Sequence, residues 1–177
     1  MAKRNIKTVE QLFSRVELSN VKQALEVGCG VGVVSSYLAE KYGWDVTGID
    51  LDPDQIKRAK NNNIKDESLK FLEADATRLP FENNEFDMVL SFDALHHIPD
   101  WDKALGEISR VLKPEGFYVL NDLAFPRLKI FEGLLKRYMS IYAVEDITRC
   151  LKRNNFVIVY VKKKVGGRFS IASQRLK

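Results

Sequence analysis

Short apolar runs that suit β-strands alternate along the chain with segments whose apolar residues recur at helical spacing. Strands are predicted over residues 23–28, 45–50, 69–75, 86–92 and 116–122, and helices around 33–38, from 53 onward, over 102–112 and over 145–154. Such alternation is typical of parallel strands joined by right-handed crossovers. The pattern therefore predicts a doubly wound α/β sheet with helices on both faces.

Both ends of the chain depart from this alternation. At the start, Thr8-Val9-Glu10-Gln11 matches a capping box, and a short amphipathic helix is predicted within residues 1–20. At the end, predicted strands over 156–163 and 168–174 are joined by Gly166-Gly167, and a Gly-Gly turn between two strands indicates a hairpin. The sheet is therefore expected to have seven strands, mostly parallel, with an antiparallel last strand.

Length and composition indicate one globular domain spanning residues 1–177. Of the 177 residues, 45% are hydrophobic and 29% are charged, which excludes the disordered and disulfide-scaffold classes. The longest uncharged run, residues 27–39, contains three glycines and is too short to span a membrane. Cys29 and Cys150 lack the spacing of a metal site or a disulfide framework. We therefore expect a cytoplasmic protein without a membrane span, a signal peptide or a bound metal.

Charge is divided unevenly along the chain. Residues 127–177 hold 13 Lys and Arg against 3 Asp and Glu, whereas residues 1–126 hold 15 against 21, for a net charge of +4 overall. A basic third of this kind is typical either of a protein that binds an anionic partner or of a well-solvated surface. The charge pattern alone leaves both interpretations open.

The most informative local pattern is a glycine-rich turn between a buried strand and a helix. Gly28, Gly30 and Gly32 occupy alternate positions directly after the first strand. Glycines permit left-handed backbone and a close approach of a ligand, and the free N–H groups of the following helix favour electron-rich atoms. The dinucleotide fingerprint G-x-G-x-x-G would need a glycine where Val33 stands. The turn therefore indicates a ligand site and argues against a nicotinamide or flavin enzyme.

Acidic residues end the next two strands at the same edge of the predicted sheet. Asp50 follows Gly28 by 22 residues, where a carboxylate can accept hydrogen bonds from both hydroxyls of a ribose. Asp75 can accept a hydrogen bond from an exocyclic amino group, and the backbone N–H of Ala76 can bond a ring nitrogen, so that together they would read an adenine. Asp52 needs no such role, because it stands at the N-cap position of the next helix.

A polar segment with two adjacent histidines follows the fourth strand. It runs SFDALHHIPD from residue 91 and places imidazole, aromatic and polar groups where a second substrate would meet the first ligand. For both His96 and His97, local packing or capping competes with a substrate-facing role. The sequence does not choose between these two interpretations.

In this order, these segments resemble a class I S-adenosylmethionine-dependent methyltransferase, and more narrowly the group that includes the ubiquinone and menaquinone biosynthesis methyltransferases. The resemblance covers residues 21–122 and rests on the segments EVGCGVG, VTGID, EADATRLPF, FDMVLSFDALHHIPD and RVLKPEGFYVLND. It implies a Rossmann-like methyltransferase fold, whose reversed last strand agrees with the predicted hairpin. Glu115 and Asn155 stand where many relatives have glycine, at turn positions that do not threaten the activity.

The resemblance also assigns roles to individual residues, with S-adenosyl-L-methionine as the cofactor. The implied contacts are Glu26 and the Ser91 backbone near the methionine amino group, Gly28, Cys29, Gly30 and Gly32 along the methionine and ribose, Asp50 at the ribose hydroxyls, Leu51 on one face of the adenine, and Asp75 with Ala76 at the adenine edge.

The function expected from this resemblance is transfer of a methyl group to a small-molecule acceptor. His96 or His97 would serve as a general base for an acceptor that arrives protonated. The identity of the acceptor, the attacked atom and the oligomeric state are not indicated. Two alternatives stay open, namely an RNA or protein methyltransferase that uses the basic third of the chain and a nucleoside-binding protein without turnover. A nucleic-acid acceptor is not favoured, because no Asn-Pro-Pro-aromatic run follows the fourth strand.

Two further segments are expected to shape the acceptor site. Residues 125–142 contain apolar side chains at helical spacing, and the N-terminal helix within residues 1–20 is a candidate lid over the cofactor site. For residues 125–142, ordinary packing on the sheet is favoured over a lipophilic acceptor groove.

Overall fold

Seven strands form one mixed sheet in the order β3-β2-β1-β4-β5-β7-β6. The computed structural model describes residues 2–63, 66–124, 142–164 and 166–177. The strands are β1 (Gln23–Val27), β2 (Asp45–Asp50), β3 (Leu69–Glu73), β4 (Phe86–Phe92), β5 (Leu112–Leu123), β6 (Phe156–Lys163) and β7 (Arg168–Arg175). The first five run parallel, whereas β7 is antiparallel to both β5 and β6. The predicted seven-stranded, mostly parallel sheet with a reversed last strand is confirmed.

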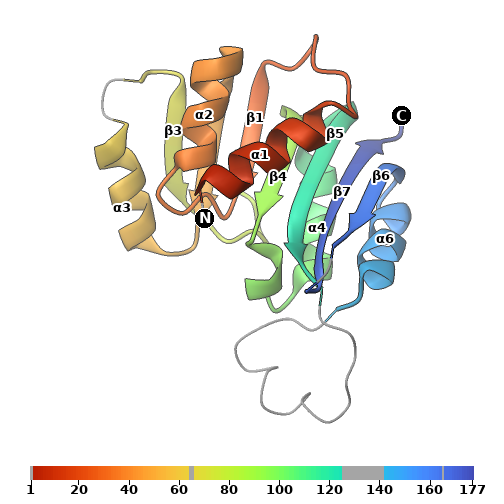
Figure 1. Ribbon diagram of the computed structural model, residues 1–177. Helices are drawn as coiled ribbons and strands as arrows, with labels where there is room; N and C mark the ends of the chain where they lie inside the picture. The colour runs from red at the N-terminus through yellow and green to blue at the C-terminus, as the bar shows by residue number, and fades with distance from the viewer. Residues whose placement is uncertain (1, 64–65, 125–141, 165) are drawn as a thin grey trace.

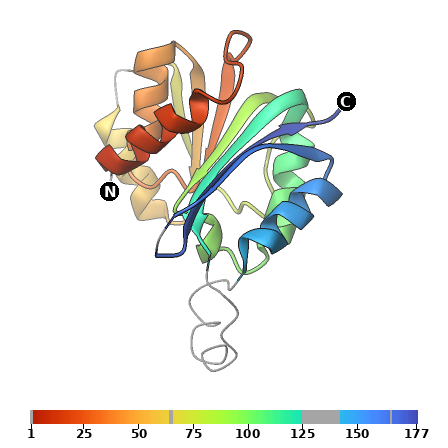
Figure 2. The same cartoon turned by 45° about the vertical axis from the view of Figure 1, so that its right-hand side comes forward.

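Helices cover both faces of this sheet (Figures 1 and 2). One face carries α1 (Ala2–Phe13), α2 (Val33–Tyr42) and α3 (Pro53–Asn62), and the other carries α4 (Trp101–Val111) and α6 (Val144–Arg153). The short 3-10 helix η1 (Leu95–His97) follows β4. Because β1 to β5 are parallel, their carboxyl ends share one edge of the sheet, and the loops after them can build a single site.

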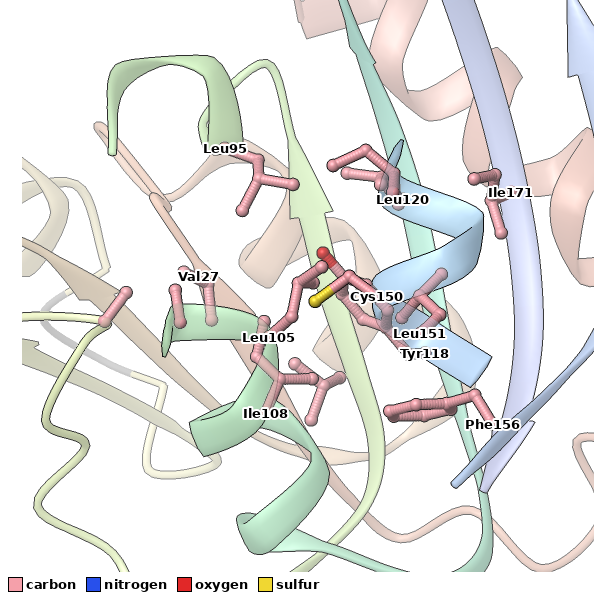
Figure 3. Packing of buried hydrophobic residues seen from close by; sticks show 14 of the residues in the cluster. Val27, Leu95, Leu105, Ile108, Tyr118, Leu120, Cys150, Leu151, Phe156 and Ile171 are labelled. Atoms are coloured by element: carbon pink, nitrogen blue, oxygen red, sulfur yellow. The ribbon is translucent and has the colours of Figure 1, made fainter. Parts of the chain in front are cut away.

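Strand residues alternate between two apolar clusters, one on each face. Leu25 and Val27 of β1 belong to one cluster. Figure 3 shows Val27 in this cluster with Leu105 and Ile108 of α4. Ala24, the neighbour of Leu25 in β1, belongs instead to the cluster that packs under α1 and α2. Since both faces are covered, the central strands are buried on both sides, which explains their nearly continuous apolar sequences.

The N-terminal helix is longer than the capping-box pattern predicts. α1 already begins at Ala2, so the predicted start at Thr8 is wrong. The Thr8 hydroxyl donates to the Arg4 carbonyl oxygen at 3.1 Å instead of capping a helix end. A threonine is tolerated inside a helix when its hydroxyl bonds the carbonyl four residues earlier. Val9 and Leu12 form the buried face of this helix and hold it against the sheet.

The boundaries of β5 also differ from the prediction. The strand begins at Leu112 rather than at residue 116, and its pairing with β4 shifts register between Phe86 and Met88. Glu115 adopts a left-handed φ of 65°, and Asn155 a left-handed φ of 62°. Both residues therefore occupy positions that suit glycine, but only Asn155 lies in a turn as predicted, because Glu115 is part of β5.

The predictions of an apolar segment before α6 and of no membrane span remain to be compared with the structure. Residues 125–141, which hold most of that apolar segment, lie outside the described residues. Within the described ranges, no helix has both the length and the apolar character needed to cross a membrane.

Candidate active site

The carboxyl ends of β1, β2, β3 and β4 open onto a cavity of about 930 Å³. Nine of the residues singled out from the sequence line it, and they come from four separate segments of the chain. They are Glu26, Gly28, Cys29, Gly30, Asp50, Leu51, Asp75, Ala76 and His97. Gly32, Ser91 and His96 do not line the cavity, and each has a different structural surrounding.

The glycine turn after β1 is tied to the end of β2. The backbone N–H groups of Gly28 and Cys29 both donate to the Ile49 carbonyl oxygen, at 2.8 and 2.9 Å. Gly28 has a φ of 74°, and a Cβ added there would stand 2.3 Å from the Ala94 Cβ. Glycine is therefore required at this position both by the backbone conformation and by the loop that follows β4.

Gly32 is surrounded by other side chains and does not line the cavity. It has a φ of 81°, and an added Cβ would lie 2.7 Å from the ring of Phe71 and 3.3 Å from Ala59. Its backbone is the N-cap of α2. The missing side chain at Gly32 lets α2 begin close to β3 and α3, so its observed role is packing.

Asp50 is held in place by the backbone of two neighbouring turns. Its Oδ2 accepts from the Gly30 N–H at 2.9 Å, and its Oδ1 accepts from the Asp52 N–H at 3.0 Å. A carboxylate has about four acceptor positions, so two remain for a ligand in the cavity. Asp52 caps α3 by accepting from the Asp54 N–H at 2.9 Å, which confirms the capping role predicted for it.

The wall next to Asp50 offers features suited to a flat, polar-edged ring. The Leu51 side chain is 69% exposed, an unusual position for a leucine, and it lines the cavity. Asp75 accepts from the Thr77 N–H at 2.8 Å, which fixes its carboxylate at the end of β3. Ala76 follows at the cavity wall and is buried. An apolar surface and a fixed carboxylate therefore lie on the same side of the cavity.

Glu26 is a buried acid at the floor of the cavity. It is 3% exposed, and its carboxylate accepts a hydrogen bond from the Ser35 hydroxyl. Burial raises the pKa of Glu26 to about 8, and the nearby charge of Asp50 adds to the shift. The carboxyl group is therefore mainly protonated at neutral pH, and a cationic ligand group beside it would favour its ionisation.

The two adjacent histidines have separate surroundings. His96 is 4% exposed, and its Nδ1 is hydrogen-bonded to the buried Asp122. Asp122 also accepts from the backbone N–H groups of Leu95 at 2.7 Å and Leu123 at 2.6 Å. The His97 ring lines the cavity with its centroid 4.0 Å from that of His96. Burial and the neighbouring His96 lower the pKa of His97, so its imidazole is neutral at physiological pH.

Ser91 lies within β4 and is fully buried. Its Cα is paired with that of Val27 across the sheet. The Ser91 hydroxyl has no hydrogen-bond partner within the part of the chain that the structure describes. A contact from its backbone to a ligand, as the family resemblance implies, remains a proposal.

Some cavity residues were not among the individual site predictions. Asn5 of α1 and Gln55 of α3 carried no signal in the sequence, whereas Thr77 after β3 and Asp93 after β4 lie inside the segments EADATRLPF and SFDALHHIPD. Asn5 is distant from the other segments along the chain and reaches them only because α1 packs across the sheet. Asp93 has a left-handed φ of 54°, which is uncommon for a residue other than glycine. Among the described residues, no cluster of three or more His, Cys, Asp or Glu side chains is suited to hold a metal ion.

Comparison with known proteins gives the family of the chain. Residues 25–120 match the family model described as a methyltransferase domain. Methyltransferase GfsG of Streptomyces halstedii is 33% identical over 127 residues, covering 70% of this chain and 45% of that protein. A 2-methyl-6-phytyl-1,4-hydroquinone methyltransferase of Synechocystis is 44% identical over 98 residues, covering 55% of this chain and 31% of that protein.

Demethylmenaquinone methyltransferase of Staphylococcus aureus is 36% identical over 120 residues, covering 67% of this chain and 50% of that protein. The chain therefore matches half or less of the length of these curated relatives.

Solved structures share the fold at lower sequence identity. The [4+2]-cyclase SpnF superposes with a TM-score of 0.85 at 18% identity, covering 96% of this chain and 80% of that one. Phosphoethanolamine N-methyltransferase 2 of Haemonchus contortus, in complex with S-adenosyl-L-methionine, superposes with a TM-score of 0.82 at 20% identity, covering 97% and 52%. These likenesses concern the fold alone, and the match to the family model shows that this chain belongs to the methyltransferase domain family.

Proposed function

We propose that this protein is an S-adenosylmethionine-dependent methyltransferase that acts on a small-molecule acceptor. The observation that carries the proposal is the cavity at the carboxyl ends of β1 to β4, where Glu26, Asp50 and Asp75 meet. Carboxyl groups of β1, of β2 and of the loop after β3 face one space large enough for a nucleoside with an amino-acid tail. The names of the matched relatives, which include quinone-pathway methyltransferases, support the same donor and acceptor class.

The residues present fit this cofactor. Glu26 is a buried carboxyl group that bonds the Ser35 hydroxyl, and a buried carboxylate of this kind suits an ammonium group better than a neutral ligand. Asp50 keeps acceptor positions for hydroxyl groups, and the exposed Leu51 offers a flat apolar contact. We assign Glu26 to the methionine amino group, Asp50 to the ribose and Leu51 with Asp75 to the adenine.

The reaction depends mainly on the alignment of the methyl donor with the acceptor atom. When bound, S-adenosylmethionine supplies an electrophilic methyl carbon on a positively charged sulfur, which an acceptor atom attacks in line. The chain contributes by holding both partners and excluding water, and orientation of this kind can supply on the order of 7–11 kcal/mol. A neutral His97 at the cavity wall can accept the proton of a hydroxyl or ammonium acceptor.

Binding of the cofactor is the first test. Isothermal titration should give saturable binding of S-adenosylmethionine and of its demethylated product. Asp50→Ala should weaken that binding at least about tenfold, because it removes charge-assisted hydrogen bonds. Asp54→Ala, which removes an exposed carboxylate from the first turn of α3, is the matched control and should bind normally. Absence of binding at millimolar ligand, or equal binding by Asp50→Ala, would contradict the proposal.

Turnover is the second test. Release of S-adenosylhomocysteine should be measured with quinols, amines, carboxylates and tRNA as acceptors. Methylation of a small acceptor is the expected result. Methylation of tRNA alone would favour the nucleic-acid alternative, and tight cofactor binding without any turnover would favour a nucleoside-binding protein.

A further inference from the structure

Two arginines from opposite ends of the chain meet on one carboxylate at the edge of the cavity. Arg4 of α1 donates from Nη2 to the Asp93 Oδ2 at 2.7 Å, and Arg168 of β7 donates from Nη1 to the Asp93 Oδ1. Asp93 itself lines the cavity, and its backbone N–H donates to the Asn121 carbonyl oxygen at 2.9 Å. Both guanidinium groups are therefore held at a fixed place beside the cavity.

A third cation joins this pair. The backbone N–H of Lys164 donates to the Arg168 carbonyl oxygen at 2.7 Å, which places Lys164 next to Arg168 on the hairpin. Burial lowers the pKa of the Lys164 ammonium, and the positive charges of Lys162, Arg168 and Arg4 lower it further. We call Arg4, Lys164 and Arg168 the cationic rim.

The cationic rim carries more positive than negative charge. Asp93 is the carboxylate paired with Arg4 and with Arg168 in the described ranges, and Lys164 makes no ion pair there. One carboxylate thus stands against three cations. A guanidinium group has five N–H donors, and Asp93 accepts from one donor of each arginine. Donors and charge both remain for an additional anion.

The position of the cationic rim separates it from the proposed cofactor contacts. β7 begins at Arg168, which is paired with Leu123 at the end of β5. Figure 1 shows the start of β7 at the edge of the sheet where β5 ends. By contrast, Asp50 ends β2 and Asp75 follows β3, on the other side of the cavity. The end of the cavity at Asp93 and His97 is therefore left for the second substrate.

We propose that the cationic rim binds an oxyanion of the methyl acceptor, a carboxylate or a phosphate, and thereby selects anionic acceptors. The inference rests on the proposed function and adds a substrate class to it. Arginine forks match the geometry of planar and tetrahedral oxyanions, and Asp93 holds the two forks in advance. An oxyanion bound there would relieve the repulsion between Lys164 and the arginines. It would also bring the attached acceptor beside His97.

The alternative is that the ion pairs only anchor α1 and β7 to the loop after β4. In that case replacing either arginine would lower stability, and replacing Lys164 would change neither stability nor anion binding. Lys164 is therefore the residue that separates the two interpretations, because it belongs to the cationic rim without forming an ion pair with Asp93.

The experiment is a titration of the ¹⁵N-labelled protein, saturated with S-adenosylhomocysteine, with inorganic phosphate and separately with benzoate at constant ionic strength. We expect saturable amide shifts of Asp93, Gly167 and Arg168 with either anion. Lys164→Gln should weaken the binding at least fivefold, and Arg168→Gln should weaken it further. Lys152→Gln, which removes one exposed charge from α6, is the matched control and should bind as the unaltered protein does.

Each other outcome has a definite meaning. Linear shifts without saturation, or an equal effect of Lys164→Gln and Lys152→Gln, would overturn the proposal. Micromolar binding of tRNA that Lys164→Gln weakens, with a strong salt dependence, would assign the cationic rim to nucleic acid and would also overturn it. Binding of S-adenosylhomocysteine is measured first in every variant. Its absence in the unaltered protein would refute the proposed function, and the anion titration would then be run without S-adenosylhomocysteine, so that the two failures are distinguished.

Discussion

His96 is hydrogen-bonded to the buried Asp122, while His97, the next residue, lines the cavity. Two adjacent imidazoles therefore have opposite surroundings, because the tight turns of η1 direct them differently. This arrangement assigns a structural part to His96 and leaves His97 as the candidate base.

Replacement of His97 tests that assignment. His97→Gln should lower the turnover of a hydroxyl acceptor by about 10²-fold or more, which is typical for loss of a general base. Cofactor affinity should stay unchanged. In the unaltered enzyme, the rate should decline only below the ordinary histidine pKa, since burial lowers the pKa of His97 and keeps the ring neutral. A variant with full activity across the pH range would show that the acceptor needs no base.

Replacement of Asp122 should affect stability. Its carboxylate bonds His96 and the backbone N–H groups of Leu95 and Leu123. Asp122→Ala leaves these buried donors without a partner, at about 1–3 kcal/mol for each unsatisfied group. Urea denaturation followed by circular dichroism measures the loss. Asp102→Ala, an exposed acid in the first turn of α4, should cost much less, and equal losses would contradict the prediction.

Glu26 should make stability depend on pH. Its pKa is raised to about 8 in the folded protein, whereas an unfolded glutamate titrates near 4.5. The folded state therefore holds a proton that the unfolded state loses, and stability falls as pH rises between these values, by about 1.4 kcal/mol per pH unit. Glu26→Gln should remove this slope. Melting temperatures at pH 5, 7 and 8.5 would reveal it, and parallel profiles would refute the predicted shift.

The same residue should couple cofactor binding to proton release. An ammonium group beside Glu26 favours its charged form, so binding near pH 7 should release a proton. Titration calorimetry in buffers of different ionisation enthalpy measures the number of protons released on binding. Glu26→Gln should release none, and an unaltered release in that variant would place the proton on another group.

Gly28 should be less tolerant of substitution than Gly43. Both have left-handed φ values, 74° and 66°, so alanine costs about 1–2 kcal/mol of backbone strain at each. At Gly28 the new Cβ would also stand 2.3 Å from Ala94, whereas nothing lies within 4 Å at Gly43. Overpacking adds about 1–3 kcal/mol. Denaturation of both variants should rank Gly28→Ala as the more damaging, and the reverse order would contradict the structure.

Element order and strand direction could be predicted from local pattern. Asp45–Asp50 and Phe86–Phe92 have the bounds that their apolar runs predict, and the Gly166-Gly167 turn correctly indicates the antiparallel last strand. The N-cap role of Asp52 could likewise be predicted from the local sequence. Such features depend on neighbours a few residues away. The start of α1 at Ala2 was not predictable in this way, because its first turn is anchored by the ion pair between Arg4 and Asp93, which lie 89 residues apart in the sequence.

What the sequence by itself determined is the fold and the edge of the sheet at which the site lies, since parallel strands bring the residues after them to a common edge. Only the tertiary structure decided which of those residues face the cavity. Gly32 belongs to the same glycine pattern as Gly28 and Gly30, yet it packs against Phe71. The meeting of Arg4 and Arg168 on Asp93 likewise has no local signature. Side-chain surroundings depend on chain segments far apart in sequence, and these come together only when the sheet and its helices have packed.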